Sequence, residues 1–336
     1  VPQNSLFVDI LFEKVYTLVT ITPQAVRRKL EVQEMGLNLS GMTTETRNPR
    51  TMQLDQMSPL EIVTVMNEED ARVPLAIAKC LPQIAQAVTW AAESFEKGGR
   101  LFYMGAGTSG RLGVLDAAEC PPTFGVPKEM VVGLIAGGEK AFIEAVEGAE
   151  DSRELAVEDL KAHGLTANDL VVGIAASGRT PYVLGGLDYA KSVGCHTAAI
   201  ACNIGSAIGK AAELAIEVNC GPEVLTGSTR LKSGTAQKLI LNMISTGSMV
   251  RTGKAYQNLM VDVQQTNEKL HTRAENIVID ATGVEREKAR AAIDAAGGSV
   301  KTAITMLLAD CDAKEAARRL ERARGHVREA IRLEVL

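Results

Sequence analysis

The chain has 336 residues, of which 46% are hydrophobic and 23% charged, a balance typical of one globular α/β domain with a small appendage. Its formal net charge is −5, and only 4% of its residues are aromatic. These values argue against nucleic acid or an anionic membrane as a partner, because they supply neither a basic field nor stacking platforms. The negative net charge does not exclude a small anionic ligand, because a few hydrogen-bond donors at one site can outweigh the charge of the whole chain.

Cysteine and histidine give no sign of a metal or redox centre. The six cysteines contain no Cys-x-x-Cys pair, and the four histidines lack metal-ligand spacing. We therefore expect reduced thiols, no metal and no cofactor. No uninterrupted apolar run approaches the roughly 18–20 residues of a membrane span, so a cytoplasmic protein is expected.

The first forty or so residues differ from the rest. The sequence begins with valine, and a polar stretch follows between residues 38 and 45. Met35 and Met42 could each be a natural start. Residues 1–43 are therefore interpreted as an extension that is disordered or non-native.

Residues 44–96 are expected to form helices that pack on the next domain. Ser58 is a cap candidate directly before Pro59, with glutamate at the third helical position. A second helix is predicted from about Val73 to Phe95, where Lys-Gly-Gly provides a stop signal.

Residues 97–274 alternate short apolar strands with helices. The strands are predicted at residues 100–104, 130–135, 170–175, 196–202 and 214–218. Near-continuous apolar strands separated by helices predict a five-stranded parallel sheet with helices on both faces. A long helix, from about Lys232 to Thr252, closes this domain. Residues 275–336 are expected to form a small all-α unit that resembles a ubiquitin-associated domain.

Two glycine-containing loops each follow a strand and open a helix. They are Gly105-Ala-Gly-Thr-Ser-Gly110, whose helix is predicted to run through Ala117, and Ser177-Gly-Arg-Thr180. Backbone N–H groups and hydroxyls at a helix N-terminus suit the oxygens of a phosphate. Both loops should open onto the carboxyl edge of the sheet, where such sheets bind ligands. The candidate phosphate-binding residues are Gly107, Thr108, Ser109, Ser177, Gly178, Arg179 and Thr180.

The first loop also satisfies the G-x-G-x-x-G pattern of dinucleotide-binding proteins. Thr108 and Ser109 put hydroxyls inside its turn, and the acidic residue expected about 20 positions later is missing, since Glu139 comes late. The second hydroxyl-rich loop favours a compact phosphomonoester site. A purely structural turn is the remaining alternative, and Arg179 could be a solvated loop charge.

The motifs around these loops resemble a known family. The two loops are similar to those of the sugar isomerase (SIS) family, which has a flavodoxin-like sandwich. Longer segments resemble the N-acetylmuramic acid 6-phosphate etherases, and the resemblance runs from about Thr43 to the C-terminus. These segments include Asp116-Ala-Ala-Glu-Cys-Pro-Pro-Thr-Phe-Gly125, Ala145-Val-Glu-Gly-Ala-Glu-Asp-Ser152 and Leu225-Thr-Gly-Ser-Thr-Arg-Leu-Lys-Ser-Gly-Thr-Ala-Gln237.

This resemblance implies a lyase that cleaves the D-lactyl ether of N-acetylmuramic acid 6-phosphate, in the recycling of peptidoglycan sugars. The family works as a homodimer without a metal. Elimination of lactate followed by addition of water needs one group to take the C2 proton and another to protonate the departing oxygen.

The family's acidic pair maps onto Glu119 and Glu150. Glu119 is expected at the C-terminal end of a helix that proline stops, where the helix dipole and partial burial would raise its pKa and favour a general acid. Glu150 is expected near the start of the next helix, where it would stay ionised as a base. A single residue serving both steps is the alternative, and Glu147 is a rival for Glu150.

Other residues carry weaker expectations. Glu223, Thr226 and Ser228 are candidate sugar contacts, and Lys232 could approach the ligand or pair with an acid. Asp116 is expected to position the first loop. Cys120 is not expected to act as a nucleophile, because no histidine is predicted nearby to activate it.

Two other functions are compatible with phosphate-binding loops of this kind. A non-catalytic regulator that senses sugar phosphates, like the glucokinase regulatory protein, would share the loops but would not need both glutamates. An aldose–ketose phosphate isomerase would use a carboxylate at C2 but gives no reason for the etherase-like motifs. The shorter chain and the retained acidic pair favour the etherase.

Overall fold

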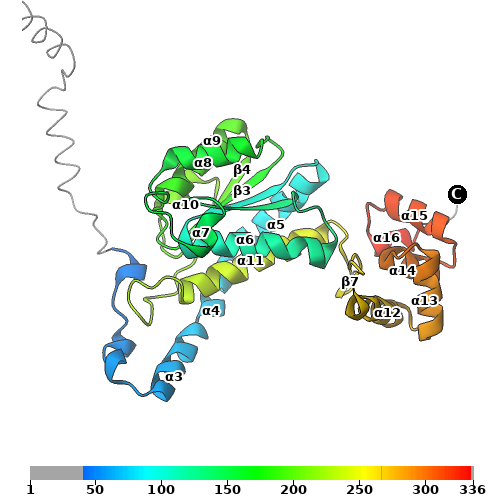
Figure 1. Cartoon of the computed structure of the whole chain (residues 1–336), viewed down its shortest axis with the longest axis horizontal. Coiled ribbons are helices and arrows are strands. Elements are labelled where there is room, and N and C mark those ends of the chain that lie inside the picture. Colours follow the sequence, from blue (N-terminus) through cyan, green and yellow to red (C-terminus); the bar gives the residue numbers. More distant parts are fainter. Residues whose placement is uncertain (1–40, 266, 334–336) are drawn as a thin grey trace, which may run out of the picture. The chain divides into compact units, whose positions relative to one another are not determined.

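The computed structural model of the chain describes residues 41–265 and 267–333. Most of the predicted N-terminal extension, residues 1–40, therefore lies outside the described residues. A sheet with its helices forms the first part of the described chain, and short helices form the last part (Figure 1).

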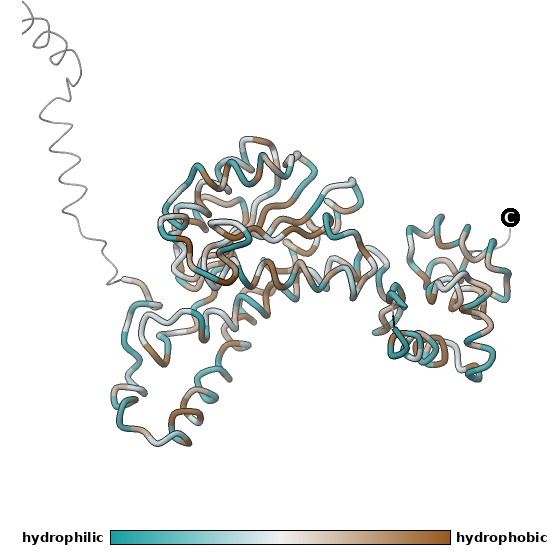
Figure 2. The backbone as a smooth tube through the Cα atoms, viewed as in Figure 1, coloured by the Kyte–Doolittle hydropathy of each residue, from teal (hydrophilic) through white to brown (hydrophobic). Residues whose placement is uncertain are grey.

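The main sheet is parallel throughout, with the strand order β2-β1-β3-β4-β5. Its strands are β1 (Leu101–Gly105), β2 (Val131–Ile135), β3 (Leu170–Ala175), β4 (His196–Ala201) and β5 (Leu214–Glu217). Every residue of β1 and β3 is buried, as their continuous apolar sequences require. Figure 2 shows hydrophobic residues along these strands. The predicted five-stranded parallel sheet is confirmed.

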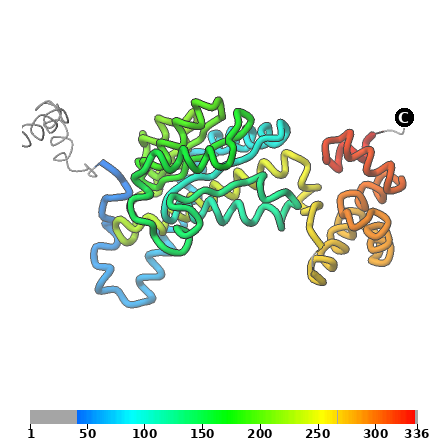
Figure 3. Tube along the Cα trace, turned by 45° about the horizontal axis from the view of Figure 1, so that its top comes forward, coloured from blue at the N-terminus to red at the C-terminus, as the bar shows by residue number. Residues whose placement is uncertain are grey.

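Helices cover both faces of this sheet (Figures 1 and 3). One face carries α5 (Leu81–Glu96), α6 (Gly107–Phe124) and α11 (Lys232–Arg251). The other carries α8 (Arg153–Ala162), α9 (Pro181–Val193) and α10 (Ala207–Ala211), with α7 (Lys140–Ile143) after β2. Because successive strand side chains point to opposite faces, Tyr103 belongs to the first core and Phe102 to the second.

The segment before the sheet consists of short turns and helices. They are the 3-10 turns η1 (Thr43–Glu45), η2 (Pro49–Thr51) and η3 (Leu54–Gln56), then α3 (Pro59–Asp70), α4 (Val73–Ile77) and η4 (Ala78–Cys80). Ser58 and Glu61 form a reciprocal capping box at the start of α3, as predicted. The prediction of one helix from Val73 to Phe95 is wrong. Pro82 lacks the backbone N–H that a continuous helix needs, and the chain restarts as α5.

The last part of the described chain is helical after a short hairpin. It contains β6 (Ala255–Tyr256), β7 (Leu259–Met260), α12 (Glu268–Thr282), α13 (Arg286–Ala295), α14 (Val300–Ala309), α15 (Ala313–Arg322) and α16 (Val327–Ala330). Residues between Tyr256 and Ala330 form a hydrophobic cluster of their own. The boundary predicted at residue 275 falls inside α12, and the division into domains stays a prediction.

Candidate active site

The two glycine loops lie at the same edge of the sheet. The first loop (residues 105–110) follows β1, and the second (residues 177–180) follows β3. These strands are parallel neighbours, with Gly105 paired to Ile174. Both loops therefore open at the carboxyl ends of adjacent strands, as the sequence predicts.

The first loop presents the N-terminus of α6. The helix begins at Gly107, and no side chain caps its first turn. Gly107 adopts a positive φ of 53°, which glycine tolerates. A Cβ at Gly110 would lie 2.6 Å from the carbonyl oxygen of Gly105, so only glycine allows this close turn. The exposed N–H groups and the positive helix end can hold an anion.

Two side chains of this loop meet α11. The Ser109 hydroxyl is buried and donates to Oε1 of Gln237 at 3.0 Å. The Thr108 methyl group is the nearest side-chain neighbour of Gly234 in the first turn of α11. Contacts with α11 therefore help to fix the conformation of the first loop.

The second loop is equally constrained. Gly178 has a φ of 74°, and a Cβ there would lie 2.4 Å from Cβ of Ser206. The Thr180 hydroxyl donates to Oε1 of Glu150 at 3.2 Å. The backbone N–H of Tyr182 donates to the Glu150 carbonyl at 3.0 Å. The loop therefore binds Glu150 through both a side chain and the backbone.

Glu150 is exposed in the turn that precedes α8. Its contact with Thr180 places its carboxylate beside the second glycine loop. Glu147, its rival, is also exposed but makes no hydrogen bond with the loop among the described residues. Ser177 and Arg179 are half-buried, and Arg179 forms no ion pair within the described part of the chain.

The predicted environment of Glu119 is wrong. The helix α6 does not stop at Pro121 and Pro122 but continues to Phe124, where the left-handed Gly125 ends it. Each proline removes one helical donor, yet the last turn survives and Gly125 donates to the Pro121 carbonyl. Glu119 is exposed along the helix rather than partly buried at its end. The partial burial expected for Glu119 at the end of a helix is therefore not observed.

Asp116 lies buried between α6 and α11. Its Oδ1 accepts hydrogen bonds from Asn242 at 2.6 Å and Ser245 at 3.1 Å. Burial raises its pKa, although these two hydrogen bonds oppose the shift. Burial also raises the pKa of the Cys120 thiol to about 12, which makes a thiolate nucleophile unfavourable.

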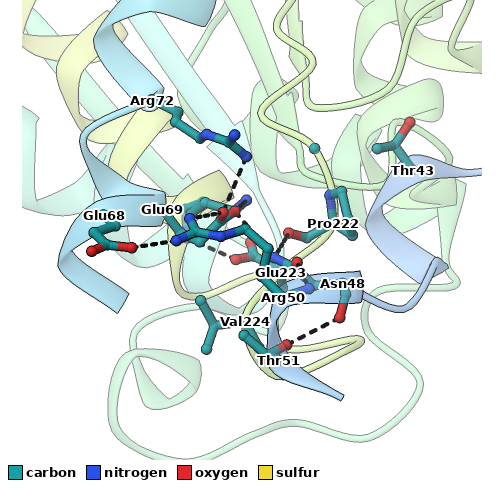
Figure 4. A network of polar contacts seen from close by, with 12 residues as sticks. Thr43, Asn48, Arg50, Thr51, Glu68, Glu69, Arg72, Pro222, Glu223 and Val224 are labelled. Atoms are coloured by element: carbon teal, nitrogen blue, oxygen red, sulfur yellow. Dashed lines mark hydrogen bonds and ion pairs between the residues drawn. The ribbon is translucent and has the colours of Figure 1, made fainter. Parts of the chain in front are cut away.

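Lys232 belongs to a buried ion cluster rather than to an open loop. Figure 4 shows Arg50 and Arg72 reaching the Glu69 carboxylate of this cluster. The Lys232 ammonium lies 2.6 Å from Oε2 of Glu69, and both side chains are 1% exposed. Arg50 and Arg72 approach the other oxygen of Glu69 at 2.8 and 3.1 Å. Burial alone would raise the pKa of Glu69, but hydrogen bonds from Lys232 and Arg50 outweigh it and lower the pKa to about 2.

Glu223 caps the start of α11 instead of facing an open site. Its Oε2 accepts from the Lys232 backbone N–H, and its Oε1 accepts from the backbone N–H and the hydroxyl of Ser233, all at 2.9 Å. A carboxylate at a helix N-terminus satisfies its free donors and complements its dipole. Ser228 is half-buried in the preceding turn. Of the two roles expected for Lys232, the structure shows the pairing with an acid. A sugar contact of Glu223 stays a prediction.

Glu69 and Gln237 were missed by the sequence analysis. Each is a polar residue on the apolar face of a helix: Glu69 follows Ile62 and Val65, and Gln237 precedes Ile240. A buried polar group in such a position needs a partner. That signal could have singled out both residues, but it could not have identified partners so distant in the sequence.

The described residues contain neither a candidate metal centre nor a candidate membrane span. There, no three His, Cys, Asp or Glu side chains gather in a way that could hold a metal ion. Across the same residues, no helix is long and apolar enough to cross a membrane.

Two family models match the chain. The N-terminal SIS domain of the glucokinase regulatory protein matches residues 83–191, and the SIS domain matches residues 154–246. Among solved structures, a phosphoheptose isomerase from Francisella tularensis has 18% identity and a TM-score of 0.46, covering 58% of this chain and 100% of that one.

Several curated relatives share one name, N-acetylmuramic acid 6-phosphate etherase. The relative from an Exiguobacterium species is 63% identical over 293 residues, which cover 87% of this chain and 100% of the relative. The relative from Serratia proteamaculans is 61% identical, covering 88% of this chain and 99% of its own length. The relative from a Geobacillus species is 60% identical, with 87% and 99% covered. The chain belongs to the N-acetylmuramic acid 6-phosphate etherase family.

Proposed function

We propose that the chain cleaves the D-lactyl ether at C3 of N-acetylmuramic acid 6-phosphate, releasing D-lactate and N-acetylglucosamine 6-phosphate. The observation that carries this proposal is 63% identity over the full length of a relative with that name. The reaction is a carbon–oxygen lyase step in the recycling of cell-wall amino sugars. No cofactor takes part in the proposed chemistry.

The sugar phosphate binds with its phosphate between the two glycine loops. The uncapped first turn of α6 and the strained turn at Gly178 both lie at the carboxyl ends of neighbouring strands. N–H groups at a helix start favour a dianion, and hydroxyls add hydrogen bonds. Ser177, Arg179 and Thr180 complete the cradle from the second loop.

The chemistry starts from the open-chain sugar, in which the C1 aldehyde acidifies the proton on C2. A base removes that proton, the C3–O bond breaks, and the departing oxygen takes a proton and leaves as the hydroxyl of D-lactate. Water then adds to C3 of the unsaturated aldehyde while C2 is protonated again. The same groups exchange acid and base roles in the second half.

Glu150 takes the C2 proton in this scheme. Its carboxylate is exposed, and it is hydrogen-bonded to Thr180 of the loop that holds the phosphate. The same hydrogen bond orients the carboxylate. The loop therefore fixes the distance between the phosphate and the base.

Glu119 acts from a second copy of the chain. Within one chain, Glu119 lies about 18 Å along the axis of α6 from Gly107, because each residue advances about 1.5 Å. That separation is too large for a hexose phosphate seated on the first loop. A second copy can bring its exposed Glu119 to the edge of the sheet.

Exposed apolar side chains support this homodimer. Leu115, one turn before Glu119 on α6, is 48% exposed, and Leu60 and Val63 of α3 are 74% and 58% exposed. Apolar surface of this kind is typical of a protein–protein interface. The contact would cover Leu115 of α6 and leave Glu119 at its rim.

The proposal is tested by incubating the protein with N-acetylmuramic acid 6-phosphate and measuring D-lactate. Release of D-lactate together with N-acetylglucosamine 6-phosphate supports the etherase. Binding of the sugar phosphate without release would favour the regulator, and conversion to a ketose phosphate would favour the isomerase.

A further inference from the structure

Ser109 and Gln237 form a buried hydrogen bond beneath the first glycine loop. Ser109 lies in the first turn of α6 and Gln237 in the second turn of α11, and their side chains are 7% and 1% exposed. The Ser109 oxygen is 3.0 Å from Oε1 of Gln237. In this arrangement the hydroxyl proton points into the protein, away from the loop surface.

The amide nitrogen of Gln237 is buried without a hydrogen-bond partner among the described residues. An unpaired buried donor is costly and calls for an explanation. A half-turn of the amide group exchanges its nitrogen and oxygen. The nitrogen would then donate to the Ser109 oxygen, and Oε1 would take its place as the unpaired atom. An unpaired oxygen is the more easily tolerated of the two, because buried acceptors are left under-satisfied more often than donors.

The two amide orientations give Ser109 opposite roles. When Oε1 faces Ser109, the hydroxyl donates inward, and only its lone pairs remain for a ligand. When Nε2 faces Ser109, the hydroxyl proton is free to point out of the loop. A phosphate dianion accepts hydrogen bonds and does not donate them, so it favours the second orientation.

We propose that Gln237 is a positioning residue that makes Ser109 a hydrogen-bond donor to the phosphate by turning its side-chain amide. The inference rests on the proposed function of the first loop as a phosphate site. Gln237 does not touch the substrate in this arrangement. It acts through Ser109, and it links α11 to the chemistry of the loop.

The helix that carries Gln237 is held firmly at its start. Glu223 accepts hydrogen bonds from the backbone of Lys232 and Ser233, and Lys232 pairs with Glu69. The amide can therefore rotate while its backbone stays in place. If Gln237 only filled space between α6 and α11, replacing it would lower the stability of the protein without specifically weakening phosphate binding.

The test compares Gln237→Met, Ser109→Ala and the double variant. Methionine keeps the length of the side chain but removes both hydrogen-bonding groups. We expect each single variant to weaken binding of inorganic phosphate about tenfold, measured by titration calorimetry, and to raise KM for the sugar phosphate more than it lowers kcat. The double variant should bind no more weakly than Ser109→Ala alone, because Gln237 acts only through Ser109.

Controls separate this inference from the proposed function. Ser248→Ala removes another buried hydrogen bond of α11 that does not reach the loop, and it should leave phosphate binding unchanged. Gln237→Leu provides a second apolar variant if Gln237→Met unfolds. An unchanged affinity in Ser109→Ala would remove Ser109 from the phosphate site. A normal affinity in both Gln237 variants, or additive losses in the double variant, would overturn the role of Gln237 alone.

Discussion

Glu150 is bound to the loop that is proposed to hold the phosphate. Thr180 donates to its carboxylate, and the backbone of Tyr182 donates to its carbonyl. A base held in this way keeps its distance to the substrate even though its side chain is exposed. Geometry of this kind contributes to catalysis by orienting the reacting group.

Replacing Glu150 with Gln tests its role as the C2 base. Glutamine keeps the size and accepts from Thr180, but it cannot take a proton. We expect kcat to fall by about 10²–10⁴ and exchange of the C2 proton with solvent deuterium to stop. Glu147→Gln, a neighbouring exposed glutamate, serves as the matched control. Exchange that persists in Glu150→Gln would remove Glu150 from this role.

The start of α11 depends on charges brought from the N-terminal segment. Glu69 of α3 pairs with Lys232. Asn48 donates to Glu69 and to the Pro222 carbonyl, which follows the last strand of the sheet (Figure 4). Thr51 donates to the Val224 carbonyl at 2.8 Å. Hydrogen bonds and an ion pair from the segment before α4 therefore hold the chain between β5 and α11 in place at the carboxyl edge of the sheet.

Removing Glu69 from the Glu69–Lys232 pair should destabilise the protein more than removing Lys232. Glu69→Gln leaves Lys232 buried with no other carboxylate partner in the described part of the chain, whereas Lys232→Met leaves Glu69 bonded to Arg50, Arg72 and Asn48. We expect the first change to lower the free energy of unfolding by about 5 kcal/mol and the second by about 3 kcal/mol. Urea unfolding measures both, and a double variant that costs the full sum would contradict coupling.

The Glu69–Lys232 pair should make the stability of the protein depend on pH in the acid range. The pKa of Glu69 is lowered from 4.5 to about 2, so its contribution is present above about pH 4.5 and is lost as the pH falls towards 2. The difference in unfolding free energy between the wild type and Glu69→Gln should shrink over that window. A difference that stays constant down to pH 2 would show that the charge of Glu69 does not matter.

The strands and loops of this fold were predictable because their signals are local. Continuous apolar runs located β1 and β3, and the hydroxyl-rich turns after them located the two loops. The path of α6 beyond Pro121 was not predictable from the proline alone, because the last turn is stabilised by Gly125. The Glu69–Lys232 contact joins residues far apart in sequence, and no local pattern indicates it.

At the scale of the whole molecule, the two acidic candidates are carried by different parts of the fold. Glu150 sits beside the second loop, whereas Glu119 lies far down α6 and is exposed. The sequence identified both residues through a resemblance to a family. It could not indicate their positions, because these depend on how far α6 extends and on how the turn before α8 meets the second loop.

Mixing two inactive variants tests the shared site. In a dimer of one Glu119→Gln chain and one Glu150→Gln chain, one of the two sites receives both natural glutamates. Random reassociation should therefore restore about a quarter of the wild-type activity, since half of the dimers are mixed. Each variant alone, treated in the same way, is the control. No recovery from verified mixed dimers would mean that both acids come from one chain.

The central claim is cleavage of the C3–O bond by elimination and addition of water. It is tested most directly by running the reaction on N-acetylmuramic acid 6-phosphate in deuterium oxide enriched in ¹⁸O and locating the labels by NMR and mass spectrometry. The mechanism predicts deuterium at C2 and ¹⁸O at C3 of N-acetylglucosamine 6-phosphate, with an unlabelled hydroxyl in D-lactate. An ¹⁸O label in the lactate hydroxyl, with none at C3 and no deuterium at C2, would contradict it.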